Sequence, residues 1–254
     1  MDVKPLSLHP DRLFPVDPSV RATARRLYEQ VRALPIVSPH GHTDPAWFAT
    51  NAPFENPTAL LLTPDHYVLR MLYSQGIPLE QLGVAPRDGG PHERDPRKAW
   101  RLFARHYGLF RGTPSRTWLD WVFAELFKLD VRLDESTADH YFDHISACLA
   151  RDDFRPRALF ERFNIEVLAT TESPLDDLAH HDAIRASGWR GRVITAFRPD
   201  PVVDPQRGRD DHVAGRVLVE DQVGLLGHHH VEGEHRFRVV HRVPEPELVP
   251  LDLA

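Results

Sequence analysis

The sequence has little cysteine, little lysine and no long apolar run. Among 254 residues there is one cysteine, Cys148, which excludes an internal disulfide. The apolar helical pattern around Cys148 favours a buried small side chain over a nucleophile. No apolar run approaches the roughly 20 residues that cross a bilayer, and the polar, proline-broken start at 1–10 lacks the apolar region of a signal peptide. We therefore expect a cytoplasmic protein with no membrane partner.

An excess of positive charge is also missing. The formal net charge is −6 at pH 7, and with three lysines nearly all of the basic charge is arginine. Phosphate backbones are bound by clustered excess cations, so we expect no nucleic-acid partner. A small anionic substrate is compatible with this balance, because one or two local arginines are enough to bind a carboxylate. The sequence also lacks a glycine-rich phosphate loop, a serine nucleophile elbow and a Cys-x-x-Cys motif.

The composition is otherwise that of a globular chain with a buried core, with 41% apolar and 27% charged residues. An aspartate–proline pair at 17–18, followed by apolar residues three and four apart, predicts a capped helix. The apolar run at 34–38 then predicts a buried strand that leads into a polar loop at 39–45.

The middle of the chain is expected to be helical. Between 57 and 163, apolar spacing and capping residues indicate helices and no strand. The predicted helices are 64–75, 95–107, 113–129, 136–150 and 155–163. So long a helical stretch directly after one strand suggests an insertion into another fold.

A strand–helix–strand pattern follows. Apolar runs at 164–170 and 192–197 predict strands, and Ser173-Pro174 is expected to cap a helix between them. Two strands joined in this way are parallel, with a right-handed crossover. The sequence therefore predicts an α/β fold, a (β/α)8 TIM barrel with a helical insertion at about 57–163, rather than an all-α protein.

The chain changes character after about residue 205. Residues 205–254 contain no lysine, tryptophan or tyrosine, and they hold six of the 16 histidines. Neither a helical nor a strand period is sustained there. We therefore expect 1–205 to be the N-terminal part of the barrel domain and 206–254 to be an atypical tail.

His40-Gly41-His42 comes directly after the first predicted strand. Residues two apart in a strand point to the same face, so both imidazoles would project together. At the C-terminal mouth of a barrel strand, two imidazoles suit a divalent metal such as zinc. With 16 histidines, chance alone gives about one His-x-His pair. Metal binding and coincidence both stay open on the pattern alone.

His66 and Tyr67 fall in the first turn of the predicted helix at 64–75. One interpretation is an acid/base pair for proton transfer. The other is a solvated histidine at a helix start, beside a core aromatic. The sequence pattern does not decide between them.

Further polar groups stand at or beyond the ends of the later predicted strands. Arg198 could bind a substrate carboxylate through two parallel hydrogen bonds, or form a surface salt bridge with Asp200. The polar run at 170–172 ends the strand at 164–170. In the helix beyond it, four residues predict a solvated face rather than ligands: Asp176, Asp177, His180 and His181.

Taken together, these segments resemble the uronate isomerase family of the amidohydrolase superfamily. The similarity runs in order from about residue 5 to about residue 205, and several ordered motifs are more specific than any single one. The motifs are LPIVSPHGHTDP at 34–45, PDHYVLRMLYSQG at 64–76, WLDWVFAELF at 118–127, FERFN at 160–164, ATTESPLDDL at 169–178 and FRPDP at 197–201.

The resemblance implies an amidohydrolase-type barrel that interconverts D-glucuronate with D-fructuronate, and D-galacturonate with D-tagaturonate, in hexuronate catabolism. It implies His40 and His42 as ligands of a divalent metal, zinc above others. His66 and Tyr67 would act on the substrate, a small uronic acid, and Arg198 would bind its carboxylate. An aldose–ketose shift needs a base, an acid and a positive group for the developing oxyanion, which these residue types supply. A homo-oligomer is compatible with the resemblance.

The sequence also departs from the family. Family members are longer, and their later strands supply a metal-ligating aspartate and a further substrate arginine without counterpart here. The residues retained after about 205 are what a shifted reading frame in a GC-rich gene would produce, so we hypothesise a truncation. A barrel that lacks strands has unpaired edges and exposed apolar surface, and its metal affinity should fall.

Two other functions stay open. One is a metal-dependent hydrolase on the same fold. The absence of lysine near the predicted strand ends weakens that interpretation, because a modified lysine bridges the two metals of binuclear enzymes of this kind. The other is a catalytically inactive fragment, which poor solubility and absent metal uptake would indicate.

Overall fold

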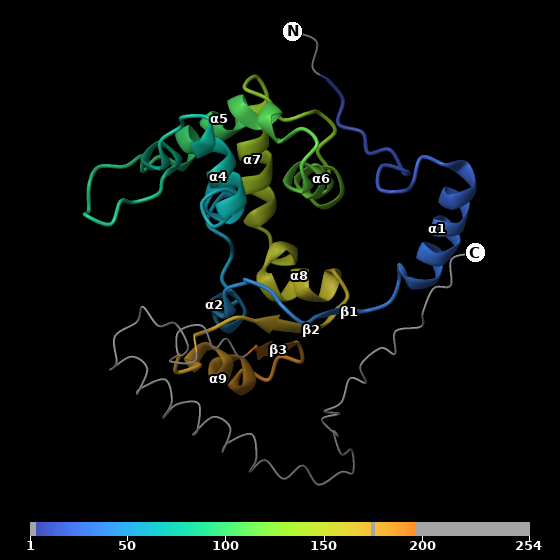
Figure 1. Cartoon of the computed structure of the whole chain (residues 1–254). Helices are drawn as coiled ribbons and strands as arrows, with labels where there is room; N and C mark the ends of the chain where they lie inside the picture. The colour runs from blue at the N-terminus through green and yellow to red at the C-terminus, as the bar shows by residue number, and fades with distance from the viewer. Residues whose placement is uncertain (1–3, 174–175, 197–254) are drawn as a thin grey trace, which may run out of the picture. The chain divides into compact units, whose positions relative to one another are not determined.

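The computed structural model describes residues 4–173 and 176–196. The described residues up to Glu172 and from Asp176 onward belong to one compact unit, in which helices dominate (Figure 1). Within this part, no helix combines the length and apolarity needed to span a membrane. In chain order the elements are α1 (Pro18–Val31), β1 (Ile36–Ser38), α2 (Pro45–Thr50), α3 (Pro57–Leu61), α4 (His66–Ser74), the 3-10 helix η1 (Leu79–Leu82), α5 (Pro96–His106), the 3-10 helix η2 (Tyr107–Phe110), α6 (Pro114–Trp121), the π-helix η3 (Val122–Leu126), α7 (Ala138–Leu149), the 3-10 helix η4 (Asp152–Phe154), α8 (Pro156–Arg162), β2 (Ile165–Thr170), α9 (Ala179–Ala186) and β3 (Arg192–Thr195).

Helix starts explain why the sequence predicted the helical stretch well. Helices α1, α2, α3, α5 and α6 each begin with a proline after a capping side chain that accepts a backbone N–H of the first turn. Proline suits that position because its φ is already helical and its missing N–H would have no partner in the helix. The capping residues are Asp17, Asp44, Asn56, Asp95 and Thr113.

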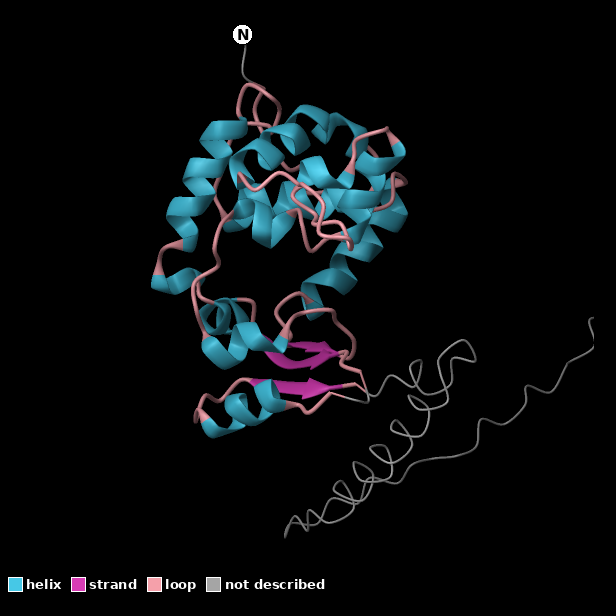
Figure 2. Cartoon of the chain, turned by 90° about the vertical axis from the view of Figure 1, so that its left-hand side faces the viewer, coloured by secondary structure: helices cyan, strands magenta, loops and turns pink. Residues whose placement is uncertain are grey.

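The three strands form a parallel sheet in the order β1-β2-β3. Figure 2 shows two of the strands as neighbouring magenta arrows that point the same way. β2 pairs with β1 on one side, and with β3 in register from Val167–Arg192 to Thr170–Thr195 on the other. α9 is the crossover between β2 and β3, which confirms the predicted βαβ unit. Because the strands are parallel, their carboxyl ends meet at one edge of the sheet.

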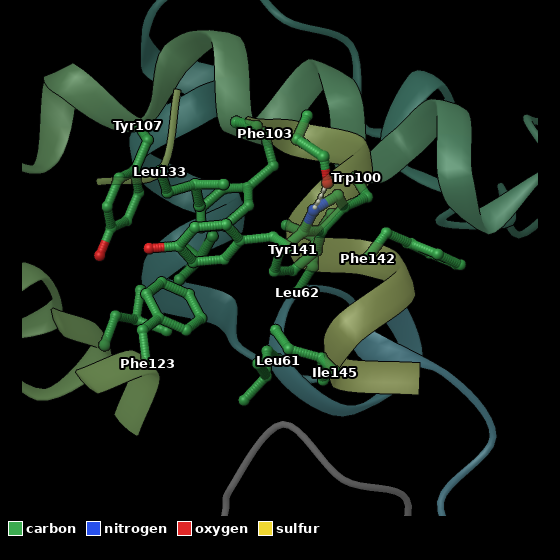
Figure 3. Packing of buried hydrophobic residues seen from close by; sticks show 14 of the residues in the cluster. Leu61, Leu62, Trp100, Phe103, Tyr107, Phe123, Leu133, Tyr141, Phe142 and Ile145 are labelled. Carbon is green, nitrogen blue, oxygen red and sulfur yellow. Dashed lines mark hydrogen bonds between the residues drawn. The ribbon is translucent and has the colours of Figure 1, made fainter. Parts of the chain in front are cut away.

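The larger core lies in the helical bundle, which we define as α3 to α7 with the short helices between them. Aromatic side chains fill it, and Trp100, Phe103, Phe123 and Tyr141 are fully buried (Figure 3). Phe123 and Tyr141 meet edge to face with ring centroids 5.0 Å apart. The buried indole is paired as well, since Trp100 Nε1 donates to the Ala138 carbonyl oxygen at 3.0 Å (Figure 3). The bundle therefore closes its own apolar core.

A smaller core holds the sheet region, which we define as the three strands with α2, α8 and α9. Phe48 of α2 meets Phe160 of α8 edge to face at 5.8 Å, and the Trp189 ring stacks on Phe48 at 5.7 Å. This packing anchors the start of α2, and with it the loop that follows β1. The buried members are Phe48, Phe160, Leu168, Ile184 and Val193.

One expectation about burial is wrong. The run at 34–38 predicted a buried strand, but Ile36 and Val37 of β1 are 49% and 60% exposed. Within the described sheet, β1 is an edge strand that pairs with β2 alone. The predicted helix α1 is present, yet none of its residues is buried. An apolar pattern shows which face would be covered, but not whether a covering element is present among the described residues.

Helix α9 begins later than its predicted cap at 173–174. Its first helical residue is Ala179, and the residue before it, Leu178, has a left-handed backbone with φ of 55°. The side chains of Asp176 and Asp177 accept hydrogen bonds from the N–H groups of Leu178 and Ala179, at 2.8 and 2.9 Å. The two aspartates therefore organise the start of the helix.

Candidate functional site

Two imidazoles converge beyond the end of β1. His40 and His42 lie in the loop between β1 and α2, and both side chains are exposed. Their Nε2 atoms are 3.2 Å apart, and the rings meet at 80° with centroids 5.0 Å apart. Strand alternation is not the cause, because β1 already ends at Ser38. The loop conformation brings the two rings together instead.

The nitrogen separation tests whether the pair fits a metal. Zinc–nitrogen bonds are about 2.0–2.1 Å long, so two nitrogens on a tetrahedral zinc lie about 3.3 Å apart. The observed 3.2 Å matches one edge of such a site. Structural and catalytic zinc sites take at least three protein ligands. Residues 4–173 and 176–196 contain no group of three or more histidine, cysteine or carboxylate side chains placed to hold a metal. The pair therefore fits two positions of a site.

Gly41 lets the loop dock against the end of β2. Its carbonyl oxygen accepts a hydrogen bond from the Thr171 hydroxyl at 3.0 Å. A Cβ atom at this position would lie 3.3 Å from the Ala169 carbonyl oxygen, tighter than most real Cβ contacts. The glycine thus does more than leave room between two imidazoles. It allows the backbone that carries them to approach a neighbouring strand closely.

A buried polar cluster lies at the end of β2, and sequence reasoning missed it. His181 of α9 is 3% exposed, and its Nε2 is 2.9 Å from the hydroxyl of Thr170, which is fully buried. The same hydroxyl is 2.8 Å from Glu172 Oε2. The expected solvated face holds for Asp176, Asp177 and His180 but is wrong for His181. A signal was available, since His181 stands three residues before Ile184, which is the spacing of one helix face.

His66 and Tyr67 lie in the first turn of α4, as predicted. Asp65 caps this turn by accepting hydrogen bonds from the N–H groups of Tyr67 and Val68, at 2.8 and 3.1 Å. The two rings are 4.1 Å apart, and Tyr67 is 64% exposed, so it is not a core aromatic. Among the described groups, no hydrogen bond, ion pair or ring contact joins either ring to the two loop histidines. Arg198 lies outside the described residues.

The tyrosines whose pKa values are raised most lie in the bundle and contribute to its packing. Burial raises the pKa of Tyr107 above its ordinary value, with the nearby Asp120 carboxylate as a further cause. The Tyr107 hydroxyl donates to Asp120 at 2.9 Å, and Arg116 binds the same carboxylate at 2.8 Å while lying over the tyrosine ring. Every polar group of this trio is paired. The cluster is therefore a structural network.

Neither of two further cavities offers a better site. A cavity of about 260 Å³ between Phe48, Leu168 and the bundle is lined almost entirely by apolar side chains and would leave a polar ligand unpaired. A cavity of about 580 Å³ beside α5 is lined by three cations, each already paired with a carboxylate. Those pairs are Lys98–Glu93, Arg101–Asp139 and Arg105–Glu135.

Comparison with known proteins identifies the family to which the chain is similar. A family model described as glucuronate isomerase matches residues 19–212. A uronate isomerase of Xanthomonas euvesicatoria pv. vesicatoria (strain 85-10) is 70% identical over 201 residues, which cover 79% of this chain and 43% of that relative. A uronate isomerase of Rhizorhabdus wittichii is 70% identical over 205 residues, covering 81% of this chain and 43% of the relative.

Solved structures give the same result. The crystal structure of glucuronate isomerase from Caulobacter crescentus matches with a TM-score of 0.79 and 58% identity, over 87% of this chain and 46% of that one. Uronate isomerase from Thermotoga maritima, at 24% identity and a TM-score of 0.69, shares the fold. The chain spans less than half the length of the relatives it matches. Because the family model matches well over half of its residues, the chain belongs to the glucuronate isomerase family.

Proposed function

We propose that the chain contributes the first part of a uronate isomerase active site, at the carboxyl edge of an amidohydrolase-type (β/α)8 barrel. The reaction would interconvert D-glucuronate with D-fructuronate, and D-galacturonate with D-tagaturonate. One observation carries the proposal: His40 and His42 converge to 3.2 Å beyond the end of a parallel strand, in a chain that belongs to the family. The carboxyl edge is where barrels of this kind place their catalytic groups.

His40 and His42 would hold a divalent metal, and the donor type and nitrogen separation favour zinc. When bound, such a cation polarises a carbonyl oxygen and stabilises negative charge on it. The remaining ligands would come from outside the described residues. The described chain supplies two exposed imidazoles and the docked backbone of Gly41 between them, which holds the segment that carries both rings.

Proton transfer would fall to His66 and Tyr67. An imidazole and a phenol can each move a proton at a substrate carbon or hydroxyl. Both side chains are exposed at the start of α4, so neither is tied up in the core. Arg198, which follows β3 in the sequence, would bind the substrate carboxylate through two parallel hydrogen bonds. A small uronic acid is then the binding partner, and the protein would act in the cytoplasm.

A second candidate is an inactive part of the same enzyme, with the family-like part ending near residue 205. Three observations favour it. The chain covers about 43% of its relatives' length, and the described residues supply two metal ligands and no third. The exposed apolar side chains of β1 also show a sheet that the described chain does not cover. In this case zinc would bind weakly, and substrate would not turn over.

An isomerase assay separates the two candidates. The purified 254-residue chain is given D-glucuronate with and without zinc, and ketose formation is followed. The glucuronate isomerase from Caulobacter crescentus serves as the positive control, and the double variant His40→Ala/His42→Ala as the matched negative one. Zinc-dependent turnover that the double variant loses supports an active site in this chain.

No turnover from a folded chain that still binds zinc through His40 and His42 supports the inactive part. Turnover that is equal in the chain and the double variant would overturn the metal assignment.

A further inference from the structure

The buried cluster behind the histidine loop has no role in the proposed chemistry, yet its polar groups are costly to bury. Thr170 is fully enclosed, and the side chains of His181 and Glu172 are 2% and 9% exposed. The cluster lies at the same sheet edge as His40 and His42, because Thr171 contacts Gly41 directly. A buried network of hydrogen-bonded polar groups makes the elements that it joins more rigid.

The donors and acceptors around the Thr170 hydroxyl indicate which group donates to which. The Thr170 hydroxyl has one hydrogen to donate and two lone pairs. Two of its neighbours are acceptor oxygens, namely Glu172 Oε2 at 2.8 Å and the Ile194 carbonyl oxygen at 3.1 Å. If the Thr170 hydroxyl donates its hydrogen to either of these oxygens, the third neighbour, His181, must donate to the hydroxyl. In that arrangement the proton of His181 is on Nε2, which donates to Thr170 over 2.9 Å.

The other ring nitrogen shows that packing alone does not explain this histidine. Nδ1 of His181 is buried and has no hydrogen-bond partner among the described groups. An apolar side chain of similar size would avoid that desolvation cost. What an apolar side chain cannot supply is the Nε2–H donor to Thr170. The donor is therefore the reason for an imidazole at this position.

The strand carries this constraint to the loop. Thr170, the last residue of β2, contacts His181 of α9, while Thr171, the next residue, contacts Gly41. The backbone between them is fixed from β3 as well, since Ala196 N–H donates to the Thr170 carbonyl oxygen at 2.7 Å. With Thr170 held from two sides, the Thr171 hydroxyl has a set direction. Its acceptor is the carbonyl midway between the two imidazoles.

We propose that His181, Thr170 and Thr171 form a positioning chain that holds the loop of His40, Gly41 and His42 in the geometry where its two imidazoles converge. His181 and Thr171 act through the backbone and do not touch the bound ligand. The inference rests on the proposed function only for what the two imidazoles bind, since the loop geometry is a property of the chain itself. Partners behind metal ligands commonly change metal affinity 10- to 100-fold, on the order expected here.

The first test measures zinc affinity by competition with a chromophoric chelator, on the 254-residue chain. Thr171→Val keeps the side-chain shape, removes the hydroxyl and should weaken zinc binding about 10-fold. Thr171→Ser restores the hydroxyl and should bind like the parent chain. His181→Leu should weaken binding in the same direction, and His181→Gln, which returns an N–H donor, should recover part of it. His180→Ala, an exposed neighbour, is the matched control.

The second test needs no metal. Amide hydrogen exchange of the zinc-free chain reports how firmly 39–43 is held. Thr171→Val and His181→Leu should speed exchange there several-fold while exchange in α5 and α7 stays unchanged, and Thr171→Ser should not. A merely destabilised fold would instead exchange faster everywhere.

The two tests fail in different ways. If the parent chain binds zinc no better than His40→Ala/His42→Ala, the proposed metal site is wrong, and exchange at 39–43 still decides the positioning chain. If Thr171→Val keeps both the parent zinc affinity and the parent exchange rates, the positioning chain is overturned whatever the loop binds.

Discussion

The helical bundle and the sheet region differ in how much of their apolar surface the described chain covers. One cluster in and around the bundle contains twenty-five buried hydrophobic residues, whereas the cluster beside the strands contains five. Apolar burial is the main driving force of folding, so the bundle carries most of the stability of the described chain. The sheet region, which presents the candidate site, depends on that scaffold.

The positions of the exposed hydrophobic side chains show the same difference in coverage. Of the fourteen large hydrophobic side chains that are exposed in the described part of the chain, nine lie between residues 13 and 37, in and around α1 and β1. Exposed apolar patches and open strand edges are surfaces that proteins normally cover. The bundle draws its partners from nearby sequence, while the sheet must collect them from distant segments. A chain that spans less than half the length of its relatives can therefore complete one and leave the other open.

The largest expected effect comes from the bundle core. Phe103→Ala should lower the free energy of unfolding by about 3–5 kcal/mol, because it empties a fully enclosed site among aromatic rings. Phe160→Ala removes the same ring from the small core and should cost less, because fewer fixed side chains surround it. Urea unfolding followed by circular dichroism measures both. Trp118→Ala, at a 39% exposed position of α6, is the control and should cost below about 1 kcal/mol.

Equal losses of unfolding free energy for the two phenylalanine variants would contradict the expected difference between the two regions. They would mean that the sheet region is packed as firmly as the bundle. Hydrogen exchange sharpens the result, since Phe160→Ala should loosen β2 and α9 while the amides of α5 and α7 keep their protection.

The same contrast explains what could be predicted from the sequence. Helix starts are local, so the cap and proline at Asp95-Pro96 placed α5 almost to the residue. The parallel pairing of β2 and β3 followed from a strand–helix–strand order. Exposure of Val37 and burial of His181 depend on which distant elements come to rest against them. The histidine pair was found from its spacing, although the loop geometry that unites it depends on a contact with Thr171, 130 positions along the chain.

A smaller effect is expected from acid. The Ser136 side chain, together with the N–H groups at 136 and 137, holds the pKa of Asp134 below its ordinary value. A carboxyl group with a lowered folded pKa stabilises the fold above its unfolded pKa of about 3.9, and that contribution is lost as pH falls through the folded value. Asp134→Asn should cost about 1 kcal/mol or less at pH 7, because the carboxylate is exposed.

Urea midpoints measured from pH 7 down to pH 2 check the sign. The parent chain should lose stability more steeply below about pH 4 than Asp134→Asn. Parallel curves for the two proteins would show that this carboxylate does not hold the start of α7. In that case the hydrogen bonds of Asp134 would not be among the local interactions that stabilise the bundle.

The smallest effect on stability is expected at α1, whose apolar residues are exposed. Leu27 is 62% exposed on a helix with no buried residue, so Leu27→Glu should change the free energy of unfolding by less than about 0.5 kcal/mol. It should, however, reduce self-association in sedimentation velocity, because it places a charge in the apolar patch. Leu119→Glu, at a fully buried position of α6, is the opposite control and should unfold the bundle. A loss of 2 kcal/mol or more from Leu27→Glu would mean that the α1 face is covered in the folded chain, and α1 would then be packed as completely as the helices of the bundle.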